Sequence, residues 1–552
     1  MNTSTASLRV YARQNFNSSI DYAILYSKIR DACARMGRER KPLVVILIAV
    51  LLIPSFIVSA SSTIQGTVRF SSVGSIVPSH SVELSINTSS GIPVSDLFFG
   101  DNLQIWSVPM FSPAPADTSL VTLVKFIRPG LIRFPGGNNE AYWDRSNTYK
   151  WWEAPPGYRY TITAQVVDDF ITFCREVGAE PFIQVDMNTY APDLWADLVK
   201  YCNIDHNYNV KYWGIGDEPN HWTTLEGYMT SSRDYVAAMA AVDPSIRLSA
   251  PEMGGIWPGD INSWIEPFVK QRGSDVHLMS AHHYPLGDES IDPSKDNYPS
   301  IENLLRYDAT DPVVAGISYL NIVSTQLLDL RDKYVPQGIV ALTEYGPSWA
   351  PLSTDNRVSD SLSTALWLAD TLGRLGMSGI HSVLYYSFTS PDWDDFRNAL
   401  FIHSRYPEEM RVVSLRPTYY AYLMYGKWRG EYWVSTSTTN DEYLSICASV
   451  SHESNDLYVI VFNKHTSKNI TATLSVYDGN VSSRGYLYIL NGDTYDATLV
   501  NINGATIDVT NSSTIENSVN DISPIGIPIS PQFSRIFPAH SASVIHIPLK
   551  GS

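Results

Sequence analysis

Two glutamates carry the chemistry that this sequence predicts. Glu218 lies in the segment Lys-Tyr-Trp-Gly-Ile-Gly-Asp-Glu-Pro-Asn, which ends at Asn220, and Glu344 lies in Gly-Ile-Val-Ala-Leu-Thr-Glu-Tyr-Gly-Pro, from Gly338 to Pro347. Each glutamate follows a strand-like apolar run and precedes a turn signal. Two carboxylates on one rim of a barrel are what a retaining glycosidase needs, one as acid/base and the other as nucleophile. If the two converge, the protein cleaves bonds between sugars.

Short, continuous apolar runs predict the strands that would position these glutamates, because strands buried on both faces show no alternation. Eight runs have this character: Leu97–Ile105, Leu131–Phe134, Pro181–Asp186, Tyr212–Gly216, Ile246–Ala250, Val276–Ala281, Gly338–Thr343 and Ser382–Ser387. Helical spacing of apolar residues is found in six intervening segments: Gln165–Val177, Asp193–Tyr201, Ser231–Val242, Ile261–Arg272, Ile317–Tyr334 and Ser359–Leu375. Together they predict a (β/α)8 TIM barrel over residues 96–430, with the glutamates after its fourth and seventh strands. The alternative, an open doubly wound sheet, usually carries a glycine-rich phosphate turn after its first strand, and the sequence has none.

A different pattern begins near Gly430 and fills residues 431–552. Short strands separated by Asn, Asp and Gly turn residues predict an antiparallel β-sandwich there. Residues 61–95 are expected to be a linker, within which Val82–Asn87 alternates like a strand that could join the sandwich. The expected fold class is therefore α/β: a TIM barrel, a C-terminal antiparallel β-sandwich and an N-terminal transmembrane helix.

The transmembrane helix is predicted from charge and hydropathy at the N-terminus. Residues 1–42 form a basic arm with eight Lys and Arg against three Asp and Glu, and Leu43–Ala60 is an uncharged run of eighteen residues. That length can cross a bilayer, and the basic flank of a span faces the cytoplasm. We expect a signal anchor that holds the protein at the cell membrane, single-pass, with the catalytic domain outside. The alternative is a secretory signal cleaved near Ala60.

Composition limits the partners and cofactors. The net charge of −17 argues against nucleic acid, because phosphate binding requires a basic patch. Four cysteines are too few for a disulfide scaffold, and no Cys/His cluster has the spacing of a zinc site. Whether Cys174 and Cys202 pair stays open, as does the oligomeric state. No cofactor or metal is expected.

Further motifs lie along the chain around the two glutamates. They are Ile132–Asn138 (Ile-Arg-Phe-Pro-Gly-Gly-Asn) with Tyr142-Trp143, Glu180–Asp186 with Leu198–Asn203, Asp243–Arg247, Ser280–Tyr284, and Arg416–Tyr422 ahead of the sandwich. In this order they resemble the α-L-arabinofuranosidase family and its relatives in glycoside hydrolase clan A. The resemblance covers residues 90–550.

The resemblance implies a role for each site residue. Glu218 would be the general acid/base and Glu344 the nucleophile, and Tyr284 would reach Glu344 from the sixth strand. Arg133 would pair with Glu344 and keep it ionised, or else form a buried salt bridge that supports the barrel. The remaining candidates for substrate binding are Asn138, Asp217, His282 and Trp349. His283 is the less favoured neighbour of His282, because one of two adjacent strand residues must point into the barrel wall.

Asp217 departs from the family, which usually has Asn before the acid/base. Asn donates a hydrogen bond to the sugar 2-hydroxyl, whereas an ionised Asp only accepts one. A charged Asp217 would raise the pKa of Glu218, and a protonated Asp217 would donate as Asn does. We therefore expect an acidic activity optimum.

The expected substrate is a carbohydrate, but the sequence leaves the sugar and linkage open. The resemblance implies arabinose-decorated plant-type or surface polysaccharide, while the Asp-Glu-Pro-Asn-His-Trp stretch is also similar to endo-acting glucanases of the same clan, whose relatives include β-xylosidases and β-glucuronidases. The candidate sugar-stacking platforms, or alternatively loop anchors, are Trp143, Trp151, Trp152, Trp257 and Trp393. Two other functions stay open: a transglycosylase, or a cell-surface carbohydrate-binding protein on a glycosidase scaffold that has lost catalysis.

Overall fold

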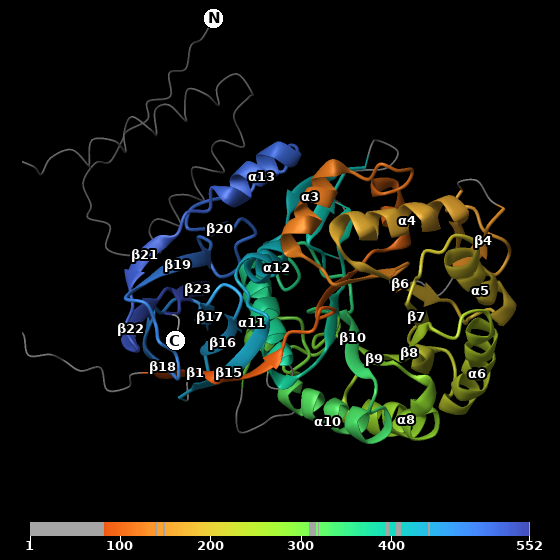
Figure 1. Ribbon diagram of the computed structural model, residues 1–552, viewed down its shortest axis with the longest axis horizontal. Coiled ribbons are helices and arrows are strands. Elements are labelled where there is room, and N and C mark those ends of the chain that lie inside the picture. Colours follow the sequence, from red (N-terminus) through yellow and green to blue (C-terminus); the bar gives the residue numbers. More distant parts are fainter. Residues whose placement is uncertain are drawn as a thin grey trace, which may run out of the picture. The chain divides into compact units, whose positions relative to one another are not determined.

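Figure 1 shows the computed structural model of the chain. The structure describes residues 82–137, 141–146, 150–307, 316–317, 319–391, 397–404, 410–439 and 442–550. Within these residues the chain forms a closed parallel barrel and a large, mostly antiparallel sheet.

The barrel has the eight strands that the apolar runs predict. Its strands close in the order β10-β11-β2-β3-β6-β7-β8-β9, all parallel to their neighbours. Their bounds are β2 Phe99–Asn102, β3 Leu131–Phe134, β6 Glu180–Val185, β7 Tyr212–Ile215, β8 Arg247–Gly254, β9 Leu278–His283, β10 Ile339–Tyr345 and β11 Ser382–Tyr385. Glu218 therefore follows the fourth barrel strand, and Glu344 lies near the end of the seventh.

Helices lie between most of the barrel strands; of the eight main helices, six fall where apolar spacing predicts them, whereas the first and the last were not predicted. The main ones are α3 Thr118–Ile127, α4 Ala164–Val177, α5 Pro192–Val199, α6 Leu225–Val242, α8 Glu266–Arg272, α10 Tyr319–Tyr334, α11 Leu362–Ser378 and α12 Pro417–Lys427. Side-chain caps begin several of them: the hydroxyl of Thr163 accepts from Val166 N at the start of α4, and Ser361 and Thr364 form a capping box on α11.

The barrel interior changes from apolar to polar along the strands. At its apolar end lies one cluster: Leu131, Phe182, Tyr212, Leu278, Ala341 and Leu384. Because side chains alternate along a strand, the residue two positions later faces the interior again. On three of these strands that next residue is Arg133, Gln184 or Thr343. The alternation thus delivers a polar layer to the rim where the carboxyl ends of the strands meet.

The C-terminal sheet is a sandwich-like unit that curls around one apolar core. Its strands are β1 Val82–Pro93, β15 Tyr432–Thr438, β16 Leu444–Ser451, β17 Asp456–Asn463, β18 Ile470–Tyr477, β19 Arg484–Asn491, β20 Asn501–Ile502, β21 Ile525–Pro528, β22 Gln532–Phe537 and β23 Ser541–Pro548. The strand expected at Val82–Asn87 does join this sheet, antiparallel to β15 and parallel to β18, and Figure 1 shows it among the bluer C-terminal strands.

The outer face of this sheet packs on barrel helices. Cys447, Ile460 and Phe462 belong to the same apolar cluster as the residues of α11 and α12. A buried ion pair crosses the contact, with Lys464 Nζ 2.6 Å from Asp370 Oδ2. One apolar cluster therefore spans the contact between the barrel helices and this sheet.

The structure does not support the predicted membrane helix or the predicted single-pass location at the cell membrane. In the part of the chain described here, from residue 82 to residue 550 with its gaps, no helix is long and apolar enough to cross a bilayer. The predicted anchor, Leu43–Ala60, lies outside the described residues. Cys174 and Cys202 are both buried and form no disulfide.

Candidate active site

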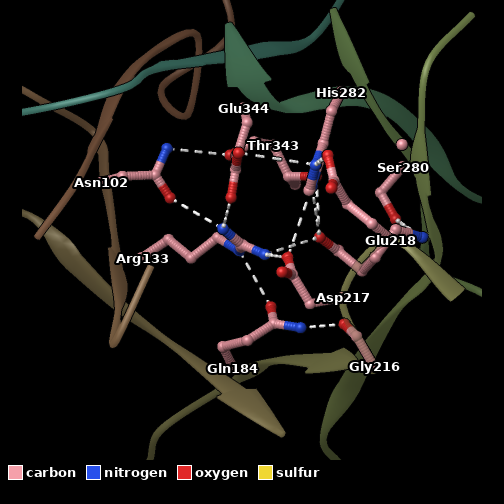
Figure 2. Close-up of polar contacts among 12 residues, drawn as sticks. Asn102, Arg133, Gln184, Gly216, Asp217, Glu218, Ser280, His282, Thr343 and Glu344 are labelled. Carbon is pink, nitrogen blue, oxygen red and sulfur yellow. Dashed lines mark hydrogen bonds and ion pairs between the residues drawn. The ribbon is translucent and has the colours of Figure 1, made fainter. Parts of the chain in front are cut away.

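Four acidic side chains and two basic ones meet at the polar rim of the barrel. Figure 2 shows Arg133, from β3, at the centre of this group, with Glu344 and Asn102 on one side and Asp217 and Gln184 on the other. Glu218 and His282 lie near them in the same view. Six different barrel strands, or the loops after them, supply the seven side chains named here.

Arg133 is fully buried and joins both halves of the site. Its Nη1 lies 2.8 Å from Glu344 Oε1, and its Nη2 lies 2.6 Å from Asp217 Oδ1. Nε donates to Gln184 Oε1 and Nη1 to Asn102 Oδ1, each at 2.9 Å. The salt bridge to Glu344 is buried, and it lies among the candidate site residues.

Glu344 is held from two sides. Arg133 binds one carboxylate oxygen, and the hydroxyl of Tyr284 donates to the other, Oε2, at 2.8 Å. Tyr284 directly follows β9, the sixth barrel strand, from which it was expected to reach Glu344. A guanidinium and a hydroxyl group therefore fix the orientation of this carboxylate.

Glu218 lies in a short turn after β7 and accepts from two imidazoles. His282 Nδ1 is 2.9 Å from Oε1, and His221 Nδ1 is 3.1 Å from Oε2. His282 Nδ1 is also 3.6 Å from Glu344 Oε2. The facing oxygens of Glu218 and Glu344 are thus at most about 6.5 Å apart, the sum of the two distances to Nδ1, at the short end of the separations found in glycosidases.

The imidazoles set the charge of Glu218. Burial alone would raise the pKa of Glu218, but the hydrogen bonds from His221 and His282 outweigh burial and hold that pKa well below its usual range. Burial likewise opposes a charge on His282, yet the surrounding carboxylates, Glu344 first among them, hold its pKa well above its usual range. In the free protein Glu218 is therefore an anion beside a buried imidazolium.

Asp217 behaves differently from its neighbour. Burial, then the charge of Glu344, raises the pKa of Asp217 to about 7, although Arg133 and His282 act in the opposite direction. Its carboxyl group is consequently protonated in mildly acidic solution. In that state it offers an O–H donor at the position where the family has an Asn donor.

A third glutamate in the site, Glu252, is fully buried and was not predicted from the sequence. Its Oε2 lies 3.3 Å from Arg133 Nη2 and 3.5 Å from His282 Nε2, and it accepts from Thr343 Oγ1 at 2.8 Å. Its other oxygen accepts from Ser249 Oγ at 2.5 Å. Burial opposes ionisation, but Arg133 and His282 prevail and lower the pKa of Glu252 to about 2.

The local backbone explains how Glu252 reaches the site. β8 shifts register against β9 between Ala250 and Met253, and Glu252 has a positive φ of 54°. Such a bulge turns a side chain that regular alternation would place elsewhere. The sequence signal was the segment Ala-Pro-Glu-Met-Gly-Gly, in which a carboxylate again follows an apolar run.

The remaining candidates divide into site and scaffold. Trp349, with 53% of its surface exposed, and Trp257 both line a pocket of about 320 Å³ that also contains Glu218 and Tyr284. His283 also borders this pocket, but it is buried between aromatic rings, and burial lowers its pKa to about 3.

The other tryptophans are scaffold residues or lie beyond the described chain. Trp143 is buried and donates to Asp197, so it is a loop anchor rather than a platform. Trp151 and Trp152 pack edge to face, and Trp151 stacks on Tyr160 in the small sheet of β4 Ala141–Asp144 and β5 Tyr160–Thr163. The predicted candidates Asn138 and Trp393 lie outside the described residues.

Three of these side chains could in principle hold a metal ion. Asp217, His282 and Glu344 offer ligand atoms within 4.8 Å of one another. Arg133, however, already binds Asp217 Oδ1 and Glu344 Oε1, so a permanent cation takes the place that a metal would need. The donor set is arranged for carboxylate–guanidinium pairing.

Comparison with known proteins gives relatives of one kind. The chain is 24% identical to α-L-arabinofuranosidase C of Emericella nidulans over 418 residues, which cover 65% of this chain and 78% of that protein. No family model matches the chain. The resemblance to α-L-arabinofuranosidases drawn from the motifs is confirmed by these homologues.

Solved structures show the same fold at lower identity. An α-L-arabinofuranosidase from Thermotoga maritima, in complex with arabinose, superposes with a TM-score of 0.61 and 20% identity, covering 84% of this chain and 99% of that one. A Paenibacillus polymyxa xyloglucanase of glycoside hydrolase family 44 superposes with a TM-score of 0.58 and 14% identity, covering 85% and 99%.

Proposed function

We propose that this protein is an arabinofuranosidase-like glycoside hydrolase that works by double displacement, with Glu344 as nucleophile and Glu218 as acid/base. The observation that carries the proposal is the approach of these two carboxylates, of which Glu218 lines the pocket. Facing oxygens at most about 6.5 Å apart favour retention, because an inverting pair needs a wider gap for water. The homologues with arabinofuranosidase activity support the same reaction class.

In the first step Glu344 attacks the anomeric carbon. Its lone pair forms the ester bond while the glycosidic bond breaks, and Glu218 gives its proton to the departing oxygen. Arg133 and Tyr284 orient Glu344, because each binds a different oxygen of its carboxylate. In the second step ionised Glu218 removes a proton from water, and the resulting hydroxide displaces Glu344.

The pocket supports action on a terminal sugar. A volume of about 320 Å³ is at the lower end for ligand sites and suits one or two sugar rings rather than a long chain. Trp257 and Trp349 present indole surface for the apolar face of a sugar, and the carboxylates and imidazoles present hydrogen-bonding groups. We propose a terminal α-L-arabinofuranosyl residue as the substrate unit, in line with the homologues.

The test of the acid/base uses aryl arabinofuranosides whose leaving groups differ in basicity. Glu218→Gln is expected to lower kcat/KM about 10²- to 10⁴-fold for basic leaving groups, which need a proton, and far less for nitrophenolates, which do not. The matched control is Glu226→Gln, an exposed glutamate at the start of α6. An equal loss across all leaving groups would rule out Glu218 as the proton donor.

The raised pKa of Asp217 predicts how the rate depends on pH. Because its pKa is raised to about 7, we expect activity to rise as pH falls through 7, when the protonated carboxyl group donates to the sugar. Asp217→Asn keeps a donor at every pH and should flatten this part of the pH–rate profile. Superimposable profiles for the wild type and the variant would refute the acidic optimum.

The raised pKa of Asp217 also affects the stability of the fold. A carboxyl whose pKa is higher in the folded than in the unfolded protein stabilises the fold at low pH, and this contribution is lost as pH rises through 7. Thermal melting at pH 5 and pH 8 should therefore show a smaller drop for Asp217→Asn than for the wild type. Its amide oxygen can still accept from Arg133.

A further inference from the structure

Both carboxylate oxygens of Glu218 are occupied in the free protein. His282 donates to Oε1 and His221 lies 3.1 Å from Oε2. A general acid must present one oxygen, with its proton, to the oxygen of the leaving group. One imidazole therefore has to give way when a sugar enters.

The two histidines differ in their freedom to move. His282 is fully buried in β9, between carboxylates on both ring nitrogens. The His221 side chain is 58% exposed on the short turn η4 Pro219–His221, and it lines the same pocket as Glu218. His221 is thus the imidazole that a sugar can displace toward solvent.

The fold nevertheless places His221 firmly against the carboxylate. Asn220 makes a reciprocal pair with the backbone of Gly254, donating to its oxygen at 3.1 Å and accepting from its nitrogen at 2.9 Å. A Cβ on Gly254 would lie 2.9 Å from both Glu218 Cδ and His221 Cε1. Because Gly254 has no side chain, the Glu218 carboxylate and the His221 imidazole can approach each other there.

The charged groups around His221 favour an imidazolium. The hydrogen bond to Glu218 raises the pKa of His221, Asp217 acts in the same direction, and burial and the charge of His282 oppose it. Asp260, in the short helix α7 Pro258–Asp260, is close enough to His221 for the two charges to interact. The free protein therefore holds one proton on this pair, as an imidazolium beside a carboxylate.

Building on the proposed function, we propose that Glu218 and His221 act as one proton-holding pair, in which His221 is a positioning residue that passes its Nδ1 proton to Glu218 when a sugar fills the pocket. The N–H bond breaks, its electron pair stays on Nδ1, and an O–H bond forms on Oε2. The neutral imidazole then turns toward solvent. Exclusion of water by the sugar drives the transfer, because it penalises an ion pair more than a neutral pair.

The pair has a characteristic pH dependence. Free protein and reactive complex carry the same number of protons, so kcat/KM stays level until His221 itself loses its proton, and the raised pKa of His221 places that loss above the ordinary range of histidine. In His221→Gln the pair has lost this proton, and activity should fall with the ionisation of Glu218 alone. We expect the basic limb to move at least one pH unit toward acid.

The experiment compares kcat/KM profiles on an aryl arabinofuranoside with a basic leaving group. His221→Gln is measured in the wild-type chain and in the Asp217→Asn background. In that background the titration of Asp217 cannot account for the basic limb of the pH profile. His452→Gln, an exposed histidine of the sandwich, is the control and should leave the profile unchanged. An identical basic limb with and without His221 overturns the proposal.

A second measurement does not depend on turnover. The ring protons of His221, assigned in NMR spectra by their loss in His221→Gln, are titrated in the wild type and in Glu218→Gln. The titration midpoint of His221 should fall when Glu218 is neutral, and an unchanged midpoint overturns the pair. An inactive wild type with an intact pair would instead refute the proposed hydrolase function alone.

Discussion

Replacing Glu344 with glutamine is expected to reduce kcat by roughly 10⁴-fold or more, the loss seen when a member of a nucleophilic catalytic unit is removed. Glutamine has nearly the same shape and can still accept from Arg133, but its amide oxygen cannot form the glycosyl ester. Folding should be retained, as judged by thermal melting. The exposed Glu226→Gln again serves as the control variant.

Azide separates the role of Glu344 from that of Glu218. In Glu344→Ala the missing carboxylate leaves space on the attacking face, so azide should restore turnover and give a glycosyl azide of inverted configuration. In Glu218→Ala the ester still forms, so azide should intercept it and give the retained configuration. If the two variants gave the opposite products, the roles of the glutamates would have to be exchanged.

The barrel could be predicted from the sequence because its strands are buried on both faces. Leu131–Phe134 was predicted with the bounds that the structure has, and Ser382–Ser387 begins at the same residue as β11. Strand order then followed from chain order, since each parallel strand lies beside its neighbours in a closed barrel. Two glutamates at the ends of strands four and seven had to reach one rim.

Glu252 could not be predicted from the same rules. Pro251 lacks a backbone donor and is normally excluded from an inner strand, which ended the predicted strand at Ala250. β8 in fact continues through a bulge to Gly254. The bulge turns Glu252 inward, and only contacts with β3, β9 and β10 reveal what it binds.

His221 illustrates a second limit. Its position beside Glu218 depends on the hydrogen bond between Asn220 and the backbone of Gly254. It also depends on the absence of a side chain at Gly254, which is far from His221 in the sequence. The hydropathy of Leu43–Ala60 likewise predicted a membrane helix, but none of the described helices can span a bilayer. Local pattern predicted elements well, whereas pairings across the rim required the tertiary structure.

Arg133 is expected to be the residue on which the stability of the site depends most. Its guanidinium lies between Asp217, Glu252 and Glu344, none of which is more than slightly exposed. Arg133→Met keeps the volume but leaves these carboxylates facing one another without that cation. Removing one partner of a buried ion pair costs about 3–5 kcal/mol of unfolding free energy.

The loss should depend on pH in a direction opposite to that of the contribution which Glu252 makes in the intact site. With Arg133, the pKa of Glu252 is lowered to about 2, so its contribution to stability is present above its unfolded value and is lost only as pH falls through 2. Without Arg133, burial raises that pKa above the unfolded value, and stability is lost as pH rises instead. Arg133→Met should therefore be closer to the wild type at pH 5 than at pH 8.

Urea unfolding at these two pH values measures both effects. The matched control is Arg145→Met, whose salt bridges to Asp197 and Asp205 are partly exposed and should cost less than about 1 kcal/mol. Should Arg133→Met not fold, Arg133→Lys keeps the charge but cannot reach four acceptors at once, so an intermediate loss is expected. A loss no larger than that of Arg145→Met would show that the carboxylates at the rim do not need the guanidinium to coexist.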